Sequence, residues 1–168
     1  MFDDLSTDMP WVILLLQDQP FAISSNYVRE MVAMPKIVSV PQMPSHIRGV
    51  INLRGQVVPV VDMRLKLGLP AGAETEDTCI IVVDVHVDGE TITVGALADA
   101  VREVMDIRSD QIEPPPRLGT RLNTEFINGM GKVDEQFMIL LNIDRIFNSE
   151  ELAWVQDATE PDKVANED

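Results

Sequence analysis

Residues 49–64 read GVINLRGQVVPVVDMR, and this stretch decides the fold. Two aliphatic runs, residues 50–53 and 57–61, are separated by Arg54 and Gly55. A two-residue break that contains glycine is typical of a tight turn, so the stretch predicts a β-hairpin with Arg54 projecting into solvent. Pro59 lies inside the second run. Because proline cannot donate a ladder hydrogen bond, that strand is expected to have a free edge or a bulge there.

Similar runs flank this hairpin along the chain. They predict further strands at residues 11–16, 21–23, 79–85, 91–97, 101–107 and 137–143. The spacing of apolar residues over 27–32 suits a short helix or the start of a strand. Asn148, followed by Glu151 three residues on, predicts a capped C-terminal helix over 149–156. Many short strands and little helix favour β-barrels over a layered α/β sheet.

Short segments recur in the same order in the two halves of the chain. The matched pairs are 14–16 with 81–83, 21–23 with 92–94, 28–31 with 101–104, 47–50 with 127–130, and 58–61 with 138–141. Recurrence in register predicts an internal duplication. We therefore expect two similar β units of about five strands, at about 10–70 and 78–147, joined by the small, acidic linker 71–77.

Composition narrows the class of protein. The 168 residues carry a formal net charge of −15. Part of it lies in an acidic N-terminus, 1–9, expected to be flexible, and in an acidic tail, 157–168, expected to be disordered. The remaining 10–156 is expected to form one domain. An acidic body repels phosphate backbones, which argues against nucleic acid as a partner. No apolar run approaches the ~20 residues that span a bilayer, so no membrane insertion is expected. The single Cys79 fits a reducing compartment, and the chain is predicted to be cytoplasmic.

Residues for catalysis are few. Cys79 begins an aliphatic run, which favours an inert buried thiol. Asp84, His86 and Asp88 alternate along a predicted strand and would share one face, where two carboxylates and an imidazole suit a divalent cation. The favoured alternative is that the valines between them point inward and these three face water. No catalytic residue, metal or cofactor is therefore predicted, and metal analysis of the purified protein would test the alternative.

At this point residues 47–55, IRGVINLRG, and 57–64, VVPVVDMR, resemble the signature of the CheW family of chemotaxis coupling proteins. The resemblance extends from about residue 11 to residue 155. It includes the segments 101–104, 114–116, 126–129, 138–145 and 148–151. The NLRG turn followed by PVVD is the specific part, whereas the aliphatic strings are not. Cys79 and Asn142 depart from the family, which has an aliphatic residue and an aspartate there.

The resemblance implies an all-β CheW-like fold: two similar five-stranded β-barrel subdomains with short helices around a shared core. It implies a non-catalytic adaptor, not an enzyme. Such an adaptor couples the cytoplasmic tips of methyl-accepting chemotaxis receptors to the histidine kinase CheA, which binds through its own CheW-like regulatory domain. Recruitment to the inner face of the membrane through receptor arrays is then expected. The alternatives are a coupling module of a non-motility receptor–kinase pathway, which partner identity in a pull-down would distinguish, and the metal protein or enzyme above.

The resemblance also implies a set of partner-binding residues. Receptor contact in the family involves the hairpin arginine, a segment after the second strand, a basic position before the hairpin, and two positions in the second half. In this chain these positions are Arg54, Val28, Glu30, Arg48, Val101 and Val104. Packing is the alternative role for the three valines, because apolar residues that flank strands usually point inward. A solvated side chain is the alternative for Arg54. The kinase is expected to dock on exposed barrel ends, without assigned residues.

Overall fold

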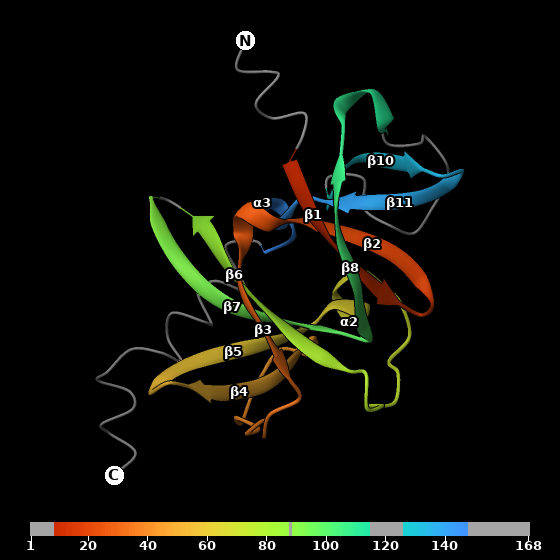
Figure 1. The fold of residues 1–168 in the computed structure, drawn as a ribbon. Helices are drawn as coiled ribbons and strands as arrows, with labels where there is room; N and C mark the ends of the chain where they lie inside the picture. The colour runs from red at the N-terminus through yellow and green to blue at the C-terminus, as the bar shows by residue number, and fades with distance from the viewer. Residues whose placement is uncertain (1–8, 88, 115–125, 148–168) are drawn as a thin grey trace.

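The computed structural model describes residues 9–87, 89–114 and 126–147. The predicted helix at 149–156 and both acidic termini lie outside these residues, apart from Met9. In the described part, eleven strands form two sheets, and the helices are short (Figure 1). The two α-helices are α2 (Met63–Lys66) and α3 (Ile143–Ile146), and two 3₁₀ turns are η1 (Ser25–Tyr27) and η2 (Ser109–Gln111). The all-β prediction is confirmed.

The strands divide between two sheets. Sheet A has the order β8 (Ala100–Ile107), β1 (Met9–Leu16), β2 (Gln19–Ser24), β11 (Gln136–Leu141), β10 (Ile127–Val133) and the two-residue β9 (Ile112–Glu113). Sheet B has the order β3 (Val28–Ala33), β6 (Cys79–Val87), β7 (Glu90–Ala98), β5 (Gln56–Asp62) and β4 (Ile47–Leu53). The hairpin predicted around Arg54 forms. The predicted strands at 11–16 and 21–23 pair antiparallel, as do those at 79–85 and 91–97.

The sequence repeat appears as a repeat of strand order. With β1 to β5 matched to β6, β7, β8, β10 and β11, both sheets have the same order of five strands. Each sheet takes its first hairpin from one half of the chain and its other strands from the other half. The halves 10–70 and 78–147 are thus repeats in sequence, and neither builds a sheet alone. Sequence similarity shows which strands correspond. It does not show which sheet a strand joins, because the β1–β2 hairpin and the β6–β7 hairpin offer equivalent edges.

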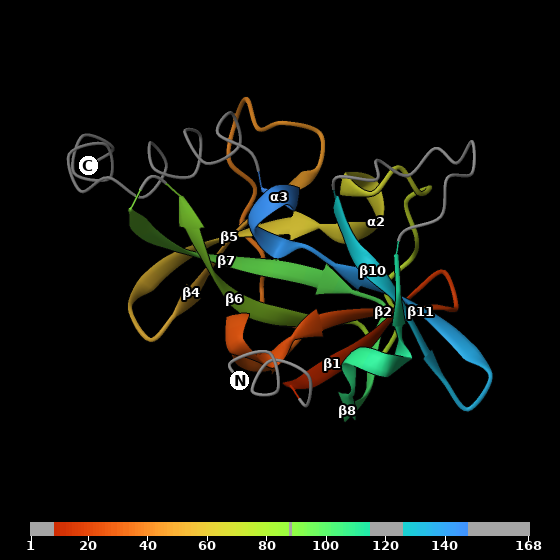
Figure 2. The ribbon, with the colours of Figure 1, turned by 90° about the horizontal axis from the view of Figure 1, so that it is seen from above.

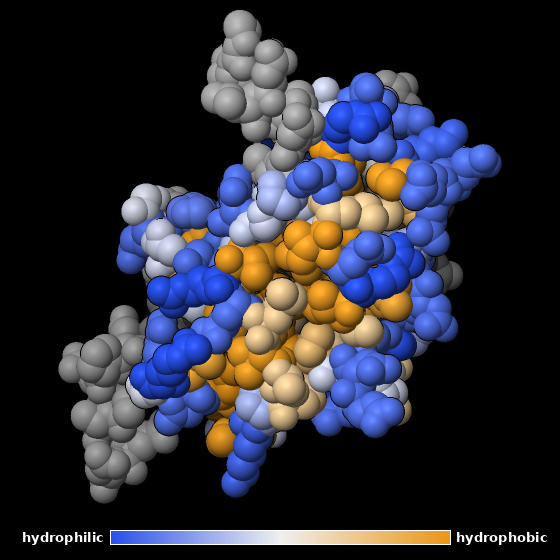
Figure 3. Space-filling model, viewed as in Figure 1, coloured by the Kyte–Doolittle hydropathy of each residue, from blue (hydrophilic) through white to orange (hydrophobic). Residues whose placement is uncertain are grey.

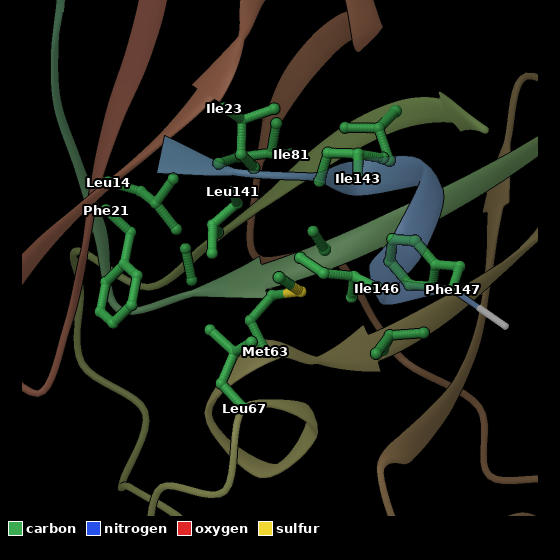
Figure 4. Packing of buried hydrophobic residues seen from close by; sticks show 14 of the residues in the cluster. Leu14, Phe21, Ile23, Met63, Leu67, Ile81, Leu141, Ile143, Ile146 and Phe147 are labelled. Atoms are coloured by element: carbon green, nitrogen blue, oxygen red, sulfur yellow. The ribbon is translucent and has the colours of Figure 1, made fainter. Parts of the chain in front are cut away.

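Each sheet buries apolar side chains on both of its faces. Apolar side chains between the sheets form one shared core, to which α3 contributes (Figure 4). Figure 2 shows α3 near the middle of the molecule. Each sheet also encloses a smaller cluster on its other face, such as Ile13 and Leu140 in sheet A and Val58 and Val82 in sheet B. Strands buried on both faces need continuous aliphatic runs instead of alternation. The aliphatic runs at residues 50–53 and 57–61 are therefore explained by strands that bury side chains on both faces of their sheet.

The repeated glycines Gly49 and Gly129 allow another segment to cross a strand. A Cβ on Gly49, whose φ is +147°, would lie 2.3 Å from the Val38 carbonyl oxygen. A Cβ on Gly129 would lie 2.8 Å from the Glu113 carbonyl oxygen. The ladder shifts register at both glycines. Each glycine thus admits a backbone crossing that any side chain would obstruct.

Local sequence explains most strand limits. β5 pairs with β7 only from Val60 onward, so Pro59 precedes that pairing, and the expected free edge is confirmed. The strand predicted over 137–143 ends at Leu141, because Asn142 caps α3 by accepting from the Arg145 backbone N–H at 3.3 Å. Asp62 caps α2 in the same way at the equivalent position. Neither four-residue helix was predicted, since each is too short for a helical period.

Candidate partner-binding surface

The turn that carries Arg54 has a defined backbone geometry. Arg54 and Gly55 have φ values of 53° and 86°. Two positive φ values are typical of the type I′ turn, whose twist matches that of the flanking strands. The Asn52 side-chain oxygen accepts a hydrogen bond from the Gly55 N–H at 2.8 Å. The turn is thus held from within the hairpin, and Arg54 is presented on a fixed backbone.

Arg54 does not project freely into water, because it pairs with Glu30. Its Nη2 donates to Glu30 Oε1 at 2.8 Å, and its Nη1 donates to Oε2. Glu30 lies on β3, the first strand of sheet B, whereas Arg54 follows β4, the last. This bidentate pair therefore links the two outer strands of the sheet. The structure brings together these two of the six expected residues, and Arg54 remains highly exposed.

The ion pair has a measurable electrostatic consequence. The hydrogen bonds from Arg54 lower the pKa of Glu30 from its usual 4.5, against a smaller opposing effect of burial. A lowered pKa means that any stabilisation from this carboxylate is present above pH 4.5 and is lost as the pH falls through the folded-state value. We expect Arg54→Ala to raise the pKa of Glu30, measured by NMR titration of its side-chain carboxyl carbon. An unchanged Glu30 titration would contradict the pairing in solution.

Arg48 lies at the other end of β4. Six residues along a strand separate it from Arg54, or about 20 Å. Its Nη1 donates to Asp62 Oδ2 at 3.1 Å, and its Nη2 donates to Glu74 Oε1 at 3.3 Å. Arg48 therefore belongs to a different part of the surface from the Arg54–Glu30 pair.

The three expected valines differ in exposure. Val28 and Val101 are half-buried and pack against the shared core, which supports the packing role for these two. Val104 on β8 is 54% exposed, and Met31 on β3 is 46% exposed. The repeat aligns residues 28–31 with 101–104, so Met31 and Val104 occupy equivalent positions. That alignment could have identified Met31, which sequence reasoning missed. On this face, apolar residues form a band between charged margins, in the region of β3 and β8 (Figure 3).

A polar cluster fixes the start of β3 against α3. The Tyr27 hydroxyl donates to Asp144 Oδ2 at 2.9 Å, and the His86 backbone N–H donates to Asp144 Oδ1 at 3.2 Å. Burial, followed by the hydrogen bond to Asp144, raises the pKa of Tyr27 to about 12. The Tyr27 hydroxyl therefore keeps its proton, and can donate to Asp144, to a higher pH than an ordinary tyrosine. This contact positions the strand that carries Glu30 and Met31.

The described residues of the alternative metal site contact other protein groups. Asp84 accepts from Thr93 Oγ1 at 2.8 Å and lies 3.3 Å from Arg29 Nε. Asp88 lies outside the described residues, and within 9–87, 89–114 and 126–147 no three such side chains gather as metal ligands. The valines at 83 and 85 point into the shared core, as the favoured alternative predicts. Burial raises the pKa of the Cys79 thiol, which keeps it in the unreactive protonated form at neutral pH.

An all-β body that presents an exposed ion pair and exposed apolar side chains suits a protein-binding module. In the described ranges, no helix is long and apolar enough to cross a membrane. The family model of the CheW-like domain matches residues 10–151. The chain therefore belongs to the CheW-like family, the non-catalytic coupling and scaffold proteins of chemotaxis, which confirms the resemblance seen in the sequence.

Individual relatives agree with this assignment. The chemotaxis protein CheW of Klebsiella aerogenes is 32% identical over 145 residues, which cover 86% of this chain and 85% of that protein. The chemotaxis protein CheW of Rhizobium meliloti is 33% identical over 134 residues, covering 80% and 84%. The crystal structure of the scaffolding protein TtCheW from Thermoanaerobacter tengcongensis matches with a TM-score of 0.76 at 30% identity, covering 86% and 90%. The expected CheW-like fold is thus confirmed.

Proposed function

We propose that this protein couples the cytoplasmic tips of chemoreceptors to a CheA-type histidine kinase. Membership of the CheW-like family supports a scaffold role in chemotaxis. The observation that carries the finer proposal is the exposed Arg54–Glu30 pair. Met31, the next residue of β3, is also exposed and points to the other face of the strand. A cation with a fixed direction suits a helical partner that offers an acidic residue.

The surface would bind without chemistry. Met31 and Val104 supply apolar anchors on the two equivalent strands, as in helix-in-groove recognition. Arg54 supplies direction, because its planar fork bonds a carboxylate bidentately, and Glu30 keeps that fork oriented until a receptor carboxylate competes for it. A coupling protein needs a second, separate surface for the kinase, so that a shift in one partner biases the other. In cells, such a protein is recruited to the inner face of the membrane by its receptors.

Arg54→Ala is expected to weaken binding to a receptor-tip fragment by about fivefold or more, as loss of an interface arginine does. The melting temperature should change little, because both the turn hydrogen bond to Asn52 and the core remain. Co-sedimentation with receptor tips and CheA, read together with kinase activity, measures the effect.

Arg108→Ala is the matched control. Arg108 is also exposed and pairs with an acidic neighbour, Asp110, at 3.1 Å, but it is the N-cap residue of η2, between β8 and β9 of sheet A. It should leave receptor binding unchanged. If both variants lost receptor binding equally, the loss would be explained by the change in net charge. If the Arg54→Ala protein were unfolded, the role of Arg54 would be structural. Failure of the unaltered protein to bind either partner would reject the proposed coupling.

A further inference from the structure

Met31 on β3 is a methionine that the fold leaves open to water. It is 46% exposed. Within residues 10–87, 89–114 and 126–147, the other methionines are half-buried or fully buried: Met34, Met43, Met63, Met105, Met130 and Met138. A small oxidant in solution therefore has its readiest access to Met31, because oxidation of a sulfur-containing side chain follows exposure.

Strand register explains why this side chain is exposed. Met31 pairs with Ile81 on β6, and Val104 pairs with Val12 on β1. Cross-strand neighbours project from the same face of a sheet, and both Ile81 and Val12 belong to the shared core. Met31 and Val104 therefore continue the shared core outward on β3 and β8, which are edge strands of the two sheets. These two strands cross the region of the apolar band between charged margins (Figure 3).

Met31 also differs in chemistry from the other exposed large apolar residues. In the part of the chain that the structure describes, those residues are Val38, Val104 and Phe137. Their hydrocarbon side chains do not react with a mild oxidant, whereas a thioether does. Met43 has a sulfur too, but its Sδ accepts a hydrogen bond from the Val40 N–H at 3.4 Å and it is half-buried. An oxidant can thus change the exposed apolar surface at Met31 while the fold stays intact.

The reaction transfers one oxygen atom to sulfur. The thioether sulfur attacks hydrogen peroxide, an S–O bond forms, the O–O bond breaks, and water leaves. The sulfur loses two electrons, and the peroxide is reduced. The product is a polar sulfoxide, and burying a polar group against a partner without a hydrogen-bond donor costs free energy. A dithiol reductase reverses the step, because the oxygen leaves as water while the two thiols become a disulfide.

We propose that Met31 is a reversible oxidation site, at which a peroxide converts the thioether to a sulfoxide and so weakens binding of a protein partner on the β3–β8 face. This effect on binding rests on the proposed function, since it adds redox control to the receptor-binding surface. Arg54 and Glu30 are not oxidised by this treatment, so the ion pair that gives the surface its direction is retained.

Graded treatment of the full-length protein with hydrogen peroxide, followed by peptide mapping with mass spectrometry, tests the site. Trypsin releases residues 30–36, a peptide that contains both Met31 and Met34. Fragmentation then compares an exposed sulfur with a half-buried one in the same peptide. Met31 should gain one oxygen atom about fivefold faster or more than Met34. Equal rates for the two residues would overturn the proposal.

Co-sedimentation with a receptor-tip fragment, after removal of the peroxide, measures the consequence. The oxidised protein should bind about fivefold more weakly or worse, and methionine sulfoxide reductases with a dithiol should restore its affinity. The quantity compared between variants is the ratio of affinities before and after oxidation, so any effect of a substitution on the starting affinity cancels. That ratio should be near one for Met31→Leu.

Met105→Leu is the matched control. Met105 follows Val104 on β8 and packs against the smaller cluster of sheet A, so its removal should leave the loss on oxidation as it is in the unaltered protein. A loss in Met31→Leu as large as in the unaltered protein would overturn the proposal. If the untreated protein bound no receptor tip, the coupling function would be rejected, and the redox control of binding with it. Peptide mapping would still show whether Met31 is the reactive site, so the two failures are distinguishable.

Discussion

Gly49→Ala is expected to lower the free energy of unfolding by about 3 kcal/mol or more. The new Cβ would lie 2.3 Å from the Val38 carbonyl oxygen and 2.8 Å from the Ile37 side chain. The first of these neighbours is backbone that is hydrogen-bonded to Val50 in both directions, at 2.8 and 2.9 Å. A small rotamer change therefore cannot relieve the clash, and the φ of +147° adds backbone strain.

Urea unfolding followed by circular dichroism measures this change, with Gly55→Ala as the control. Gly55 also has a positive φ, +86°, but a Cβ there meets nothing within 4 Å. It should therefore cost only about 1–2 kcal/mol from strain in the left-handed region. If Gly49→Ala were no more destabilising than Gly55→Ala, the crossing of the Val38 segment would contribute nothing to stability.

Much of the architecture could be predicted from the sequence because its signals are local. The turn at Arg54 and Gly55, the aliphatic runs and the repeat each depend on residues close together in the chain. The exchange of hairpins between sheets could not be predicted in this way. It depends on which hairpin edge β3 and β8 pair with. In the structure, β3 pairs with β6 and β8 pairs with β1.

The candidate site, like the fold, could be predicted only in part from the sequence. Arg54 and Glu30 are 24 residues apart in sequence, and only the curvature of sheet B brings them together. Arg48 was expected with them, yet strand geometry places it at the far end of β4 beside Glu74. Glu74 lies in a stretch that was predicted as a plain linker, with no signal that its carboxylate would face an arginine. Side-chain partners between distant segments are a tertiary property, and residue type alone does not reveal them.

Asp62→Ala is expected to cost about 3 kcal/mol of unfolding free energy, because it removes two functions of one buried carboxylate. It deletes the cap of α2, which is worth about 1 kcal/mol. It also leaves Arg48 without its buried partner, and breaking one side of such a pair is strongly destabilising. The estimate stays near the low end of that range, since a third of the Arg48 side chain is exposed and water can reach it.

The repeat supplies the control that separates these two functions. Asn142 occupies the equivalent position and caps α3 with a neutral side chain. Asp62→Asn should likewise keep the cap and lose only the charge, so it should be less destabilising than Asp62→Ala by about 1 kcal/mol in urea unfolding. Equal losses would mean that the cap contributes nothing.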